Sequence, residues 1–185
     1  GGYVVLGFTV SFGSGSRDVW LIKTDAQGNM EWDKTFGGSE RDEGYSVQQT
    51  TDGGYIITGY TESFGNGQYD VWLIKTDSQG QEEWDKTFGG SVWDEGYSVQ
   101  QTTEGGYIIT GYTISYGNGA KDIWLVKTDN AGNEEWNYTF GGINNEAGQQ
   151  ILQTFSGGYV IVGYTESRGS GQMDVKLIKT SPAGI

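Results

Sequence analysis

The sequence predicts an all-β fold, specifically a β-propeller of four-stranded antiparallel blades, and three observations carry this prediction. The tripeptide Gly-Gly-Tyr begins at Gly1, Gly53, Gly105 and Gly157, a constant spacing of 52 residues. Each unit contains four short alternating or β-branched runs separated by turn residues, and none has the i, i+3, i+4 apolar spacing of a helix. Four strands in about 40 to 50 residues are typical of a propeller blade, which cannot bury its faces without neighbours.

The second unit shows where the strands are expected. Asp52-Gly53-Gly54 and Ser78-Gln79-Gly80 supply residues that tolerate positive φ, as tight hairpins require. A longer loop occupies 63–69, and 88–94 leads to the next unit. We therefore expect strands at 55–61 (YIITGYT), 70–76 (DVWLIKT), 82–88 (EEWDKTF) and 96–102 (GYSVQQT). A strand of the last type, at the end of one repeat, is the first strand of the next blade.

The repeats divide the chain into units 1–52, 53–104 and 105–156 and a partial unit at 157–185. The first two units agree at about three-quarters of their positions, which indicates recent duplication of one structural unit. Counting strand types predicts 14 strands, with the first blade lacking its innermost strand and the last its outermost. The sequence starts without an initiator Met or a signal peptide, so we expect it to be part of a longer protein.

Incomplete blades at both ends leave three arrangements open. The chain is a fragment of a propeller of about six to eight blades, a four-bladed ring that closes imperfectly, or a protomer that completes its blades with another chain. Each arrangement would cover the strand edges and apolar faces that an isolated terminal blade exposes.

Tryptophan follows the repeat. One set of rings recurs on the 70–76 type of strand and a second set on the 82–88 type, so we expect both to pack between neighbouring blades. These are Trp20, Trp72 and Trp124, followed by Trp32, Trp84 and Trp136, which leaves Trp93 as the tryptophan outside the pattern.

Composition excludes several classes of function. The chain has 33 glycines without the three-residue period of collagen, and 14% aromatic residues, too many for a disordered chain. Its net charge of −13 would repel nucleic acids and anionic membrane surfaces, and no apolar run approaches the roughly 20 residues that cross a bilayer. With neither Cys nor His, it has no disulfide, no Cys/His zinc site and no Ser-His-Asp triad.

The repeat also resembles a known family. The stretch 77–84 (DSQGQEEW), following Trp72-Leu-Ile-Lys75, is similar to the tryptophan-docking segment of quinoprotein-like propellers, and the whole unit resembles propeller repeats of bacterial and archaeal secreted or surface proteins. The resemblance implies a propeller that is extracellular or on the cell surface and serves in binding, adhesion or scaffolding more often than in catalysis. It implies no pyrroloquinoline quinone, because the segment is one residue shorter and no adjacent cysteine pair is present.

Acidic residues that recur in every unit are expected to hold turns through their backbone N–H groups. A sharper hypothesis is calcium coordination, since Ca²⁺ prefers several converging carboxylate and carbonyl oxygens. Its candidate ligands are Asp18, Asp70, Asp122 and Asp174. The pairs Asp42-Glu43 and Asp94-Glu95 raise the alternative of a glycan-processing hydrolase, but their recurrence and the Glu146-Ala147 replacement argue against it.

Positions that vary between units predict the binding face. In a four-stranded meander, the second-to-third hairpin and the blade-to-blade connection lie on one rim, and the repeats differ most in these two loops. Loops on a rigid scaffold are where recognition is usually built, with Trp, Tyr and Arg as frequent anchors. The predicted partner-binding residues are Arg17, Arg41, Tyr69, Trp93, Lys121, Asn145 and Met173.

Together these observations predict a non-enzymatic extracellular propeller module that binds a protein or a glycan or builds an assembly, with calcium as the one conceivable cofactor. The alternatives are a self-assembling protomer that completes its blades with a neighbouring chain, and a hydrolase. The prediction includes no nucleic acid partner and no membrane insertion.

Overall fold

The computed structural model describes residues 1–169 and 172–185, and these form antiparallel sheets with no helix between them. Fourteen strands make four sheets in chain order, of three, four, four and three strands. The first sheet contains β1 (Tyr3–Thr9), β2 (Asp18–Thr24) and β3 (Met30–Phe36). The second contains β4 (Asp42–Gln49), β5 (Tyr55–Thr61), β6 (Asp70–Thr76) and β7 (Glu82–Phe88). The third contains β8 (Asp94–Gln101), β9 (Tyr107–Thr113), β10 (Asp122–Thr128) and β11 (Glu134–Phe140). The fourth contains β12 (Glu146–Gln153), β13 (Tyr159–Thr165) and β14 (Asp174–Lys179).

This arrangement confirms the all-β class, the four-stranded antiparallel units and the expected distribution of strands. The first sheet lacks the counterpart of β4 and the last lacks the counterpart of β7. Strands β5, β6 and β7 have the expected bounds, whereas β8 begins at Asp94 instead of Gly96 and ends at Gln101 instead of Thr102. It begins earlier because Asp94 and Glu95 pair with Thr113 and Tyr112 ahead of a β-bulge.

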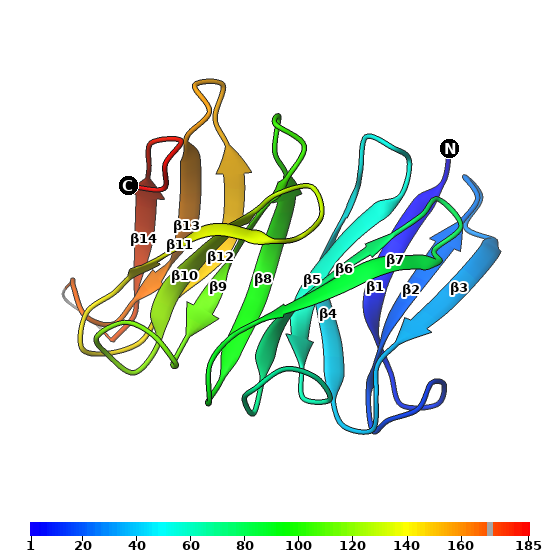
Figure 1. The fold of residues 1–185 in the computed structure, drawn as a ribbon, viewed down its shortest axis with the longest axis horizontal. Helices are drawn as coiled ribbons and strands as arrows, with labels where there is room; N and C mark the ends of the chain where they lie inside the picture. Colours follow the sequence, from blue (N-terminus) through cyan, green and yellow to red (C-terminus); the bar gives the residue numbers. More distant parts are fainter. Residues whose placement is uncertain (170–171) are drawn as a thin grey trace.

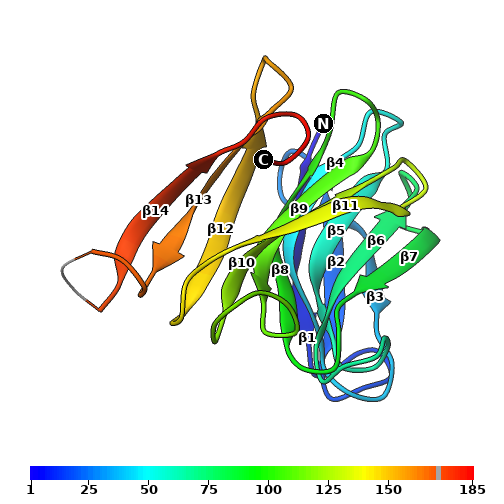
Figure 2. The same cartoon turned by 60° about the vertical axis from the view of Figure 1, so that its left-hand side comes forward.

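The four sheets succeed one another along the molecule, from the N-terminal sheet at one end to the C-terminal sheet at the other (Figure 1). Viewed from a second direction, the β12–β14 sheet diverges from its neighbour toward its outer strand (Figure 2). Contacts between neighbouring sheets are made mainly through the inner strands: β8 contacts both β4 and β12, and β1, β5 and β9 each contact the inner strand of the next sheet.

Apolar side chains fill the space between each pair of sheets. Between the second and third sheets, Leu73 and Ile56 pack with Ile109, Trp124 and Val126. Equivalent clusters lie at the other two junctions. Trp72 and Trp124 are buried and Trp84 packs against the core, so these tryptophans lie between sheets as expected.

Glutamine side chains tie the inner strands together. The Gln101 N–H donates to Oε1 of Gln48 at 2.7 Å, and the Gln153 N–H donates to Oε1 of Gln100 at 2.7 Å. An inner strand has no hydrogen-bonded neighbour on its free edge, and these bonds satisfy amide groups there. The glutamines therefore link consecutive sheets through their inner edges.

The outward faces of the two end sheets are apolar and exposed. Val175 and Leu177 are 82% and 71% exposed, whereas their counterparts Val71 and Leu73 are 1% and 0% exposed between sheets. Tyr3 on the first sheet is 62% exposed and its counterpart Tyr55 only 3%. The end faces thus carry the residue types that elsewhere form the core, without a sheet packed on them.

Candidate functional site

The predicted rim residues meet in pairs at the junctions between sheets. Isolated parallel bridges join Arg17 to Arg41, Tyr69 to Trp93, and Lys121 to Asn145. At the middle junction, the Asp94 N–H donates to the Tyr69 carbonyl at 2.9 Å. The two variable loops therefore share one rim, as the meander argument requires. The seventh residue, Met173, follows the corresponding loop of the last sheet and is exposed.

The calcium candidates anchor the long loops. Oδ2 of Asp70 accepts the N–H groups of Asn66 and Gly67 at 2.8 and 2.9 Å, and Asp18 and Asp122 make equivalent bonds to Gly15 and Asn118. Asp174 begins β14 at the matching position. Within residues 1–169 and 172–185, no three acidic side chains gather as a metal-binding group. Calcium binding therefore stays a prediction.

A second acidic residue recurs at the start of the inner strands, as Asp42, Asp94 and Glu146. Its carboxylate accepts hydrogen bonds from N–H groups of the rim loops. Asp94 is fully buried and accepts from Ser115 Oγ at 2.6 Å, from the Gly90 N–H at 2.8 Å and from the Thr113 hydroxyl. Burial, and then the charge of Asp94, raise the pKa of Asp70, whereas the loop N–H bonds oppose that shift. These acids act as structural links between loops.

Six aromatic rings form a continuous chain of contacts from the rim onto the inner strands, here named the inner aromatic row. Successive ring centroids lie 5.9, 4.5, 5.8, 5.5 and 5.8 Å apart, and such pairs are attractive beyond the area that they bury. Trp93 is 44% and Tyr45 is 43% exposed, so the row presents aromatic surface to solvent. In order, the row consists of Trp93, Tyr69, Tyr60, Tyr45, Tyr97 and Tyr112.

A β-bulge positions Tyr45, and another positions Tyr97. Gly44 pairs with Gly59 and Ser46 pairs with Thr58, so Tyr45 is an extra residue without a partner in the ladder. The same shift occurs between Gly96 and Ser98 around Tyr97. Bulges re-aim side chains and are frequent beside functional sites. Sequence reasoning did not identify Tyr45, Tyr60, Tyr97 and Tyr112 as site residues. The signal that all four share is a Gly-Tyr step inside a strand.

Two carboxylates lie beside the row. Glu43 is buried, pairs with Arg17, and accepts from the Tyr45 hydroxyl at 3.4 Å. Glu95 accepts from the Tyr112 hydroxyl at 2.6 Å. Burial, followed by the hydrogen bond to Glu95, raises the pKa of Tyr112, so its phenol stays a donor at neutral pH.

Cations also contact rings of this region. The guanidinium of Arg17 lies 4.7 Å from the centroid of Phe8, and Nζ of Lys121 lies 3.8 Å from the centroid of Tyr112. Both distances are within the range of cation–π attraction. The site combines exposed rings, acceptors and two basic groups, and this chemistry suits binding of a polar ligand.

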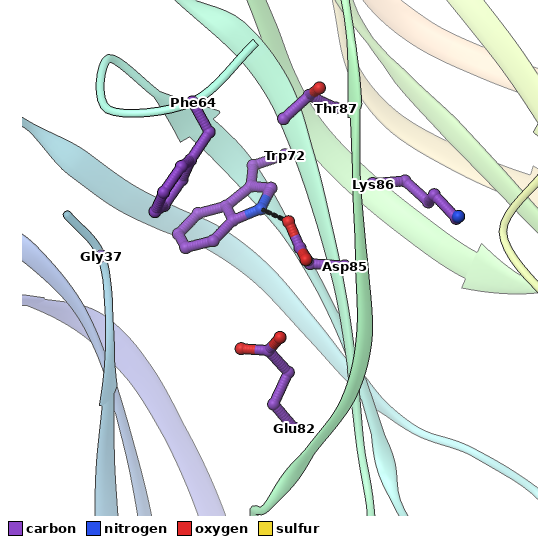
Figure 3. A pocket seen from close by; sticks show the side chains of 7 residues that line it. All are labelled: Gly37, Phe64, Trp72, Glu82, Asp85, Lys86 and Thr87. Carbon is purple, nitrogen blue, oxygen red and sulfur yellow. Dashed lines mark hydrogen bonds between the residues drawn. The ribbon is translucent and has the colours of Figure 1, made fainter.

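A separate hollow of about 430 Å³ opens on the outer side of the junction between the first two sheets (Figure 3). Indole Nε1 of Trp72 donates to Oδ2 of Asp85 at 2.8 Å, while the Glu82 carboxylate points toward the space beside the ring. Burial, and then the charge of Asp85, raise the pKa of Glu82. The bond recurs from Trp20 to Asp33 at 2.8 Å and from Trp124 to Asn137 at 3.2 Å, in the three sheets that have an outer strand. Because it recurs, we interpret it as structural and place the candidate site at the inner aromatic row.

Comparisons with known proteins indicate the fold without naming a function. No family model matches the chain. It is 24% identical over 196 residues to a regulatory protein, FlaEY, of Caulobacter vibrioides, covering 92% of this chain and 20% of that protein. A solved structure from Bacteroides caccae, of a protein of unknown function, superimposes with a TM-score of 0.55 at 15% identity, covering 97% of this chain and 55% of that one.

The chain therefore spans about a fifth of the length of this relative and about half of that solved chain. At these identities the likeness concerns the fold alone. In the described part of the chain, no helix is long and apolar enough to span a membrane.

Proposed function

We propose that the chain is a module of a β-propeller that acts outside the cell or on its surface by binding a protein or a glycan, without catalysis. The observation that carries this proposal is the inner aromatic row, which joins the predicted rim residues Tyr69 and Trp93 to Tyr45 and Tyr97 on the inner strands. Exposed aromatic rings next to hydrogen-bonding carboxylates are typical of recognition surfaces.

Three features support the propeller. The sheets are antiparallel meanders, they contact each other mainly through their inner strands, and a 52-residue period generates each of them.

The hydrolase alternative needs a free acid and a free base. Asp94 already accepts hydrogen bonds from three donors, two on loops and one on β9, and its neighbour Glu95 accepts from Tyr112. This engagement favours a binding role over a catalytic one.

Removing the rim rings of Trp93 and Tyr69 is expected to weaken recognition. Trp93→Ala combined with Tyr69→Ala should weaken binding at least about tenfold, because aromatic anchors carry a large share of interface energy. Binding would be measured on a glycan array and by pull-down from secreted proteins, followed by titration of the identified ligand. Phe155→Ala removes an exposed ring from a hairpin of the opposite rim and should bind like the parent. Equal binding by the double variant and by the Phe155 variant would refute the proposal.

Self-assembly is a second candidate function, favoured by the apolar end faces. The outward face of the last sheet carries Leu152, Val162, Val175 and Leu177, and the free face of the first sheet carries Tyr3 and Val5. Inside the array, the counterparts of these two sets face each other, so a second copy joined end to end would repeat an interface already present.

We expect native mass spectrometry to show species larger than the 20.2 kDa monomer, with a dimer at micromolar concentration. Val175→Asp with Leu177→Asp should return the protein to monomer, since a buried unpaired carboxylate is costly. A parent protein that stays monomeric at about 100 µM, where even weak homodimers associate, would refute self-assembly by this chain.

A further inference from the structure

The three junctions between sheets carry different charges at equivalent positions. The rim base is Arg17 at the first junction and Lys121 at the third, with Tyr69 between them. The acid on the following inner strand is Glu43 and then Glu95, and it is replaced by Ala147 at the third junction. The first junction thus has base and acid, the second only the acid, and the third only the base.

The first junction shows what this arrangement holds. Arg17 extends over the ring of Phe8 at 4.7 Å and forms an ion pair with Glu43, whose side chain is buried. The pair also raises the pKa of Arg17, chiefly through the hydrogen bond to Glu43. A guanidinium between an aromatic ring and a buried carboxylate is a favourable arrangement because its planar group stacks and donates at once.

The second junction keeps this environment without the guanidinium. Tyr69 replaces the arginine and stacks on Tyr60, the counterpart of Phe8, at 4.5 Å. Glu95 accepts from the Tyr112 hydroxyl at 2.6 Å, and no lysine or arginine among the described residues forms an ion pair with it. The exposed indole of Trp93 lies alongside, 5.9 Å from Tyr69.

We propose that the second junction binds an arginine side chain of a partner protein, with the guanidinium on Glu95 and against the stacked rings of Tyr69 and Trp93. This inference rests on the proposed function and names the chemistry of the partner. Arginine suits the site better than lysine because its planar fork both stacks on rings and donates two parallel bonds to a carboxylate. The net charge of −13 attracts a basic partner from a distance.

The direct test is a titration with Nα-acetyl-arginine amide, which has no charge besides its guanidinium. Binding would be followed through the Trp93 indole N–H signal in NMR spectra of the full chain. We expect saturable binding at one site, and at least about tenfold weaker binding of Nα-acetyl-citrulline amide, which has nearly the same shape without the charge. Glu95→Gln should weaken arginine binding by a similar factor, whereas Glu135→Gln, on the outer strand β11, makes the same charge change and should not.

The repeat supplies two variants whose side chains already occur at equivalent positions. Tyr69→Arg places an arginine on Glu95, as Arg17 lies on Glu43, and should close the site to added arginine. Arg17→Tyr combined with Arg41→Trp gives the first junction the same rings as the second, with Glu43 as the free acid, and should raise the number of sites from one to two.

Equal affinity for the arginine and citrulline amides, native affinity in Glu95→Gln or Tyr69→Arg, or a single site in the Arg17→Tyr/Arg41→Trp variant would each overturn the inference. If an identified partner loses binding to Trp93→Ala but not to Glu95→Gln, the arginine site fails while the binding face stands. If the partner is indifferent to both, the proposed function fails too.

Discussion

Asp94→Ala is expected to lower the free energy of unfolding by about 3 kcal/mol or more. The carboxylate is fully buried and accepts from Thr113, Ser115 and Gly90, and its removal leaves these donors without a partner inside the protein. Buried donors left unsatisfied cost about 1 to 3 kcal/mol each when water cannot reach them. The three groups lie on two loops and a strand, so the rim should also lose its order.

Urea denaturation followed by tryptophan fluorescence measures this loss. Asp129→Ala is the matched control, because Asp129 accepts N–H bonds from Ala131 and Asn133 in an exposed turn. Water can replace those bonds, and we expect a cost of about 1 kcal/mol or less. If both substitutions shift the midpoint equally, the buried carboxylate does not link the loops as described.

Gly59→Ala is expected to prevent folding or to cost about 3 kcal/mol or more. A Cβ at this position would lie 1.8 Å from the carbonyl oxygen of Glu43 and 2.9 Å from the Cα of Gly44. These are backbone atoms of the paired strand, which cannot move aside without breaking the ladder. The loss of stability should therefore reach or exceed the upper end of the range of about 1 to 3 kcal/mol that overpacked cores show.

The first repeat provides the matched substitution for this experiment. Gly7 occupies the same place as Gly59, but a Cβ there would meet nothing within 4 Å because the first sheet has no inner strand beyond β1. Gly7→Ala should therefore change the melting temperature little or raise it slightly. A large loss of stability in Gly7→Ala would instead show that another strand pairs with β1 in solution, which makes this variant a probe of blade completion.

Repeat spacing and turn chemistry were enough to predict most of the fold. The 52-residue period located β5, β6 and β7 at their bounds because glycine-containing turns end each strand. The start of β8 was missed by two residues because Asp94 and Glu95 read as loop acids, although they pair with β9 ahead of the bulge.

The candidate site was predictable only in its rim. Sequence variation marked Tyr69 and Trp93, and the meander topology placed their loops together. The tyrosines of the inner strands escaped notice because their recurrence suggested a structural role, and because two-residue alternation cannot assign a face to Tyr45 or Tyr97 across a bulge. Whether their contacts make a surface depends on packing between sheets, which a local pattern does not encode.

The glutamine bonds between inner strands give the array a polarity. In both cases the earlier repeat provides the side-chain acceptor and the next repeat the backbone donor: Gln48 accepts from the Gln101 N–H, and Gln100 accepts from the Gln153 N–H. The series stops at the third repeat, in the inner strand of the fourth sheet, where Leu152 occupies the position of Gln48 and Gln100 and is exposed. Anything that covers the last sheet must therefore approach its inner edge without a glutamine acceptor and meet an apolar side chain there instead. Leu152 therefore makes the last sheet differ from the two four-stranded sheets, whose inner strands carry a glutamine at this position.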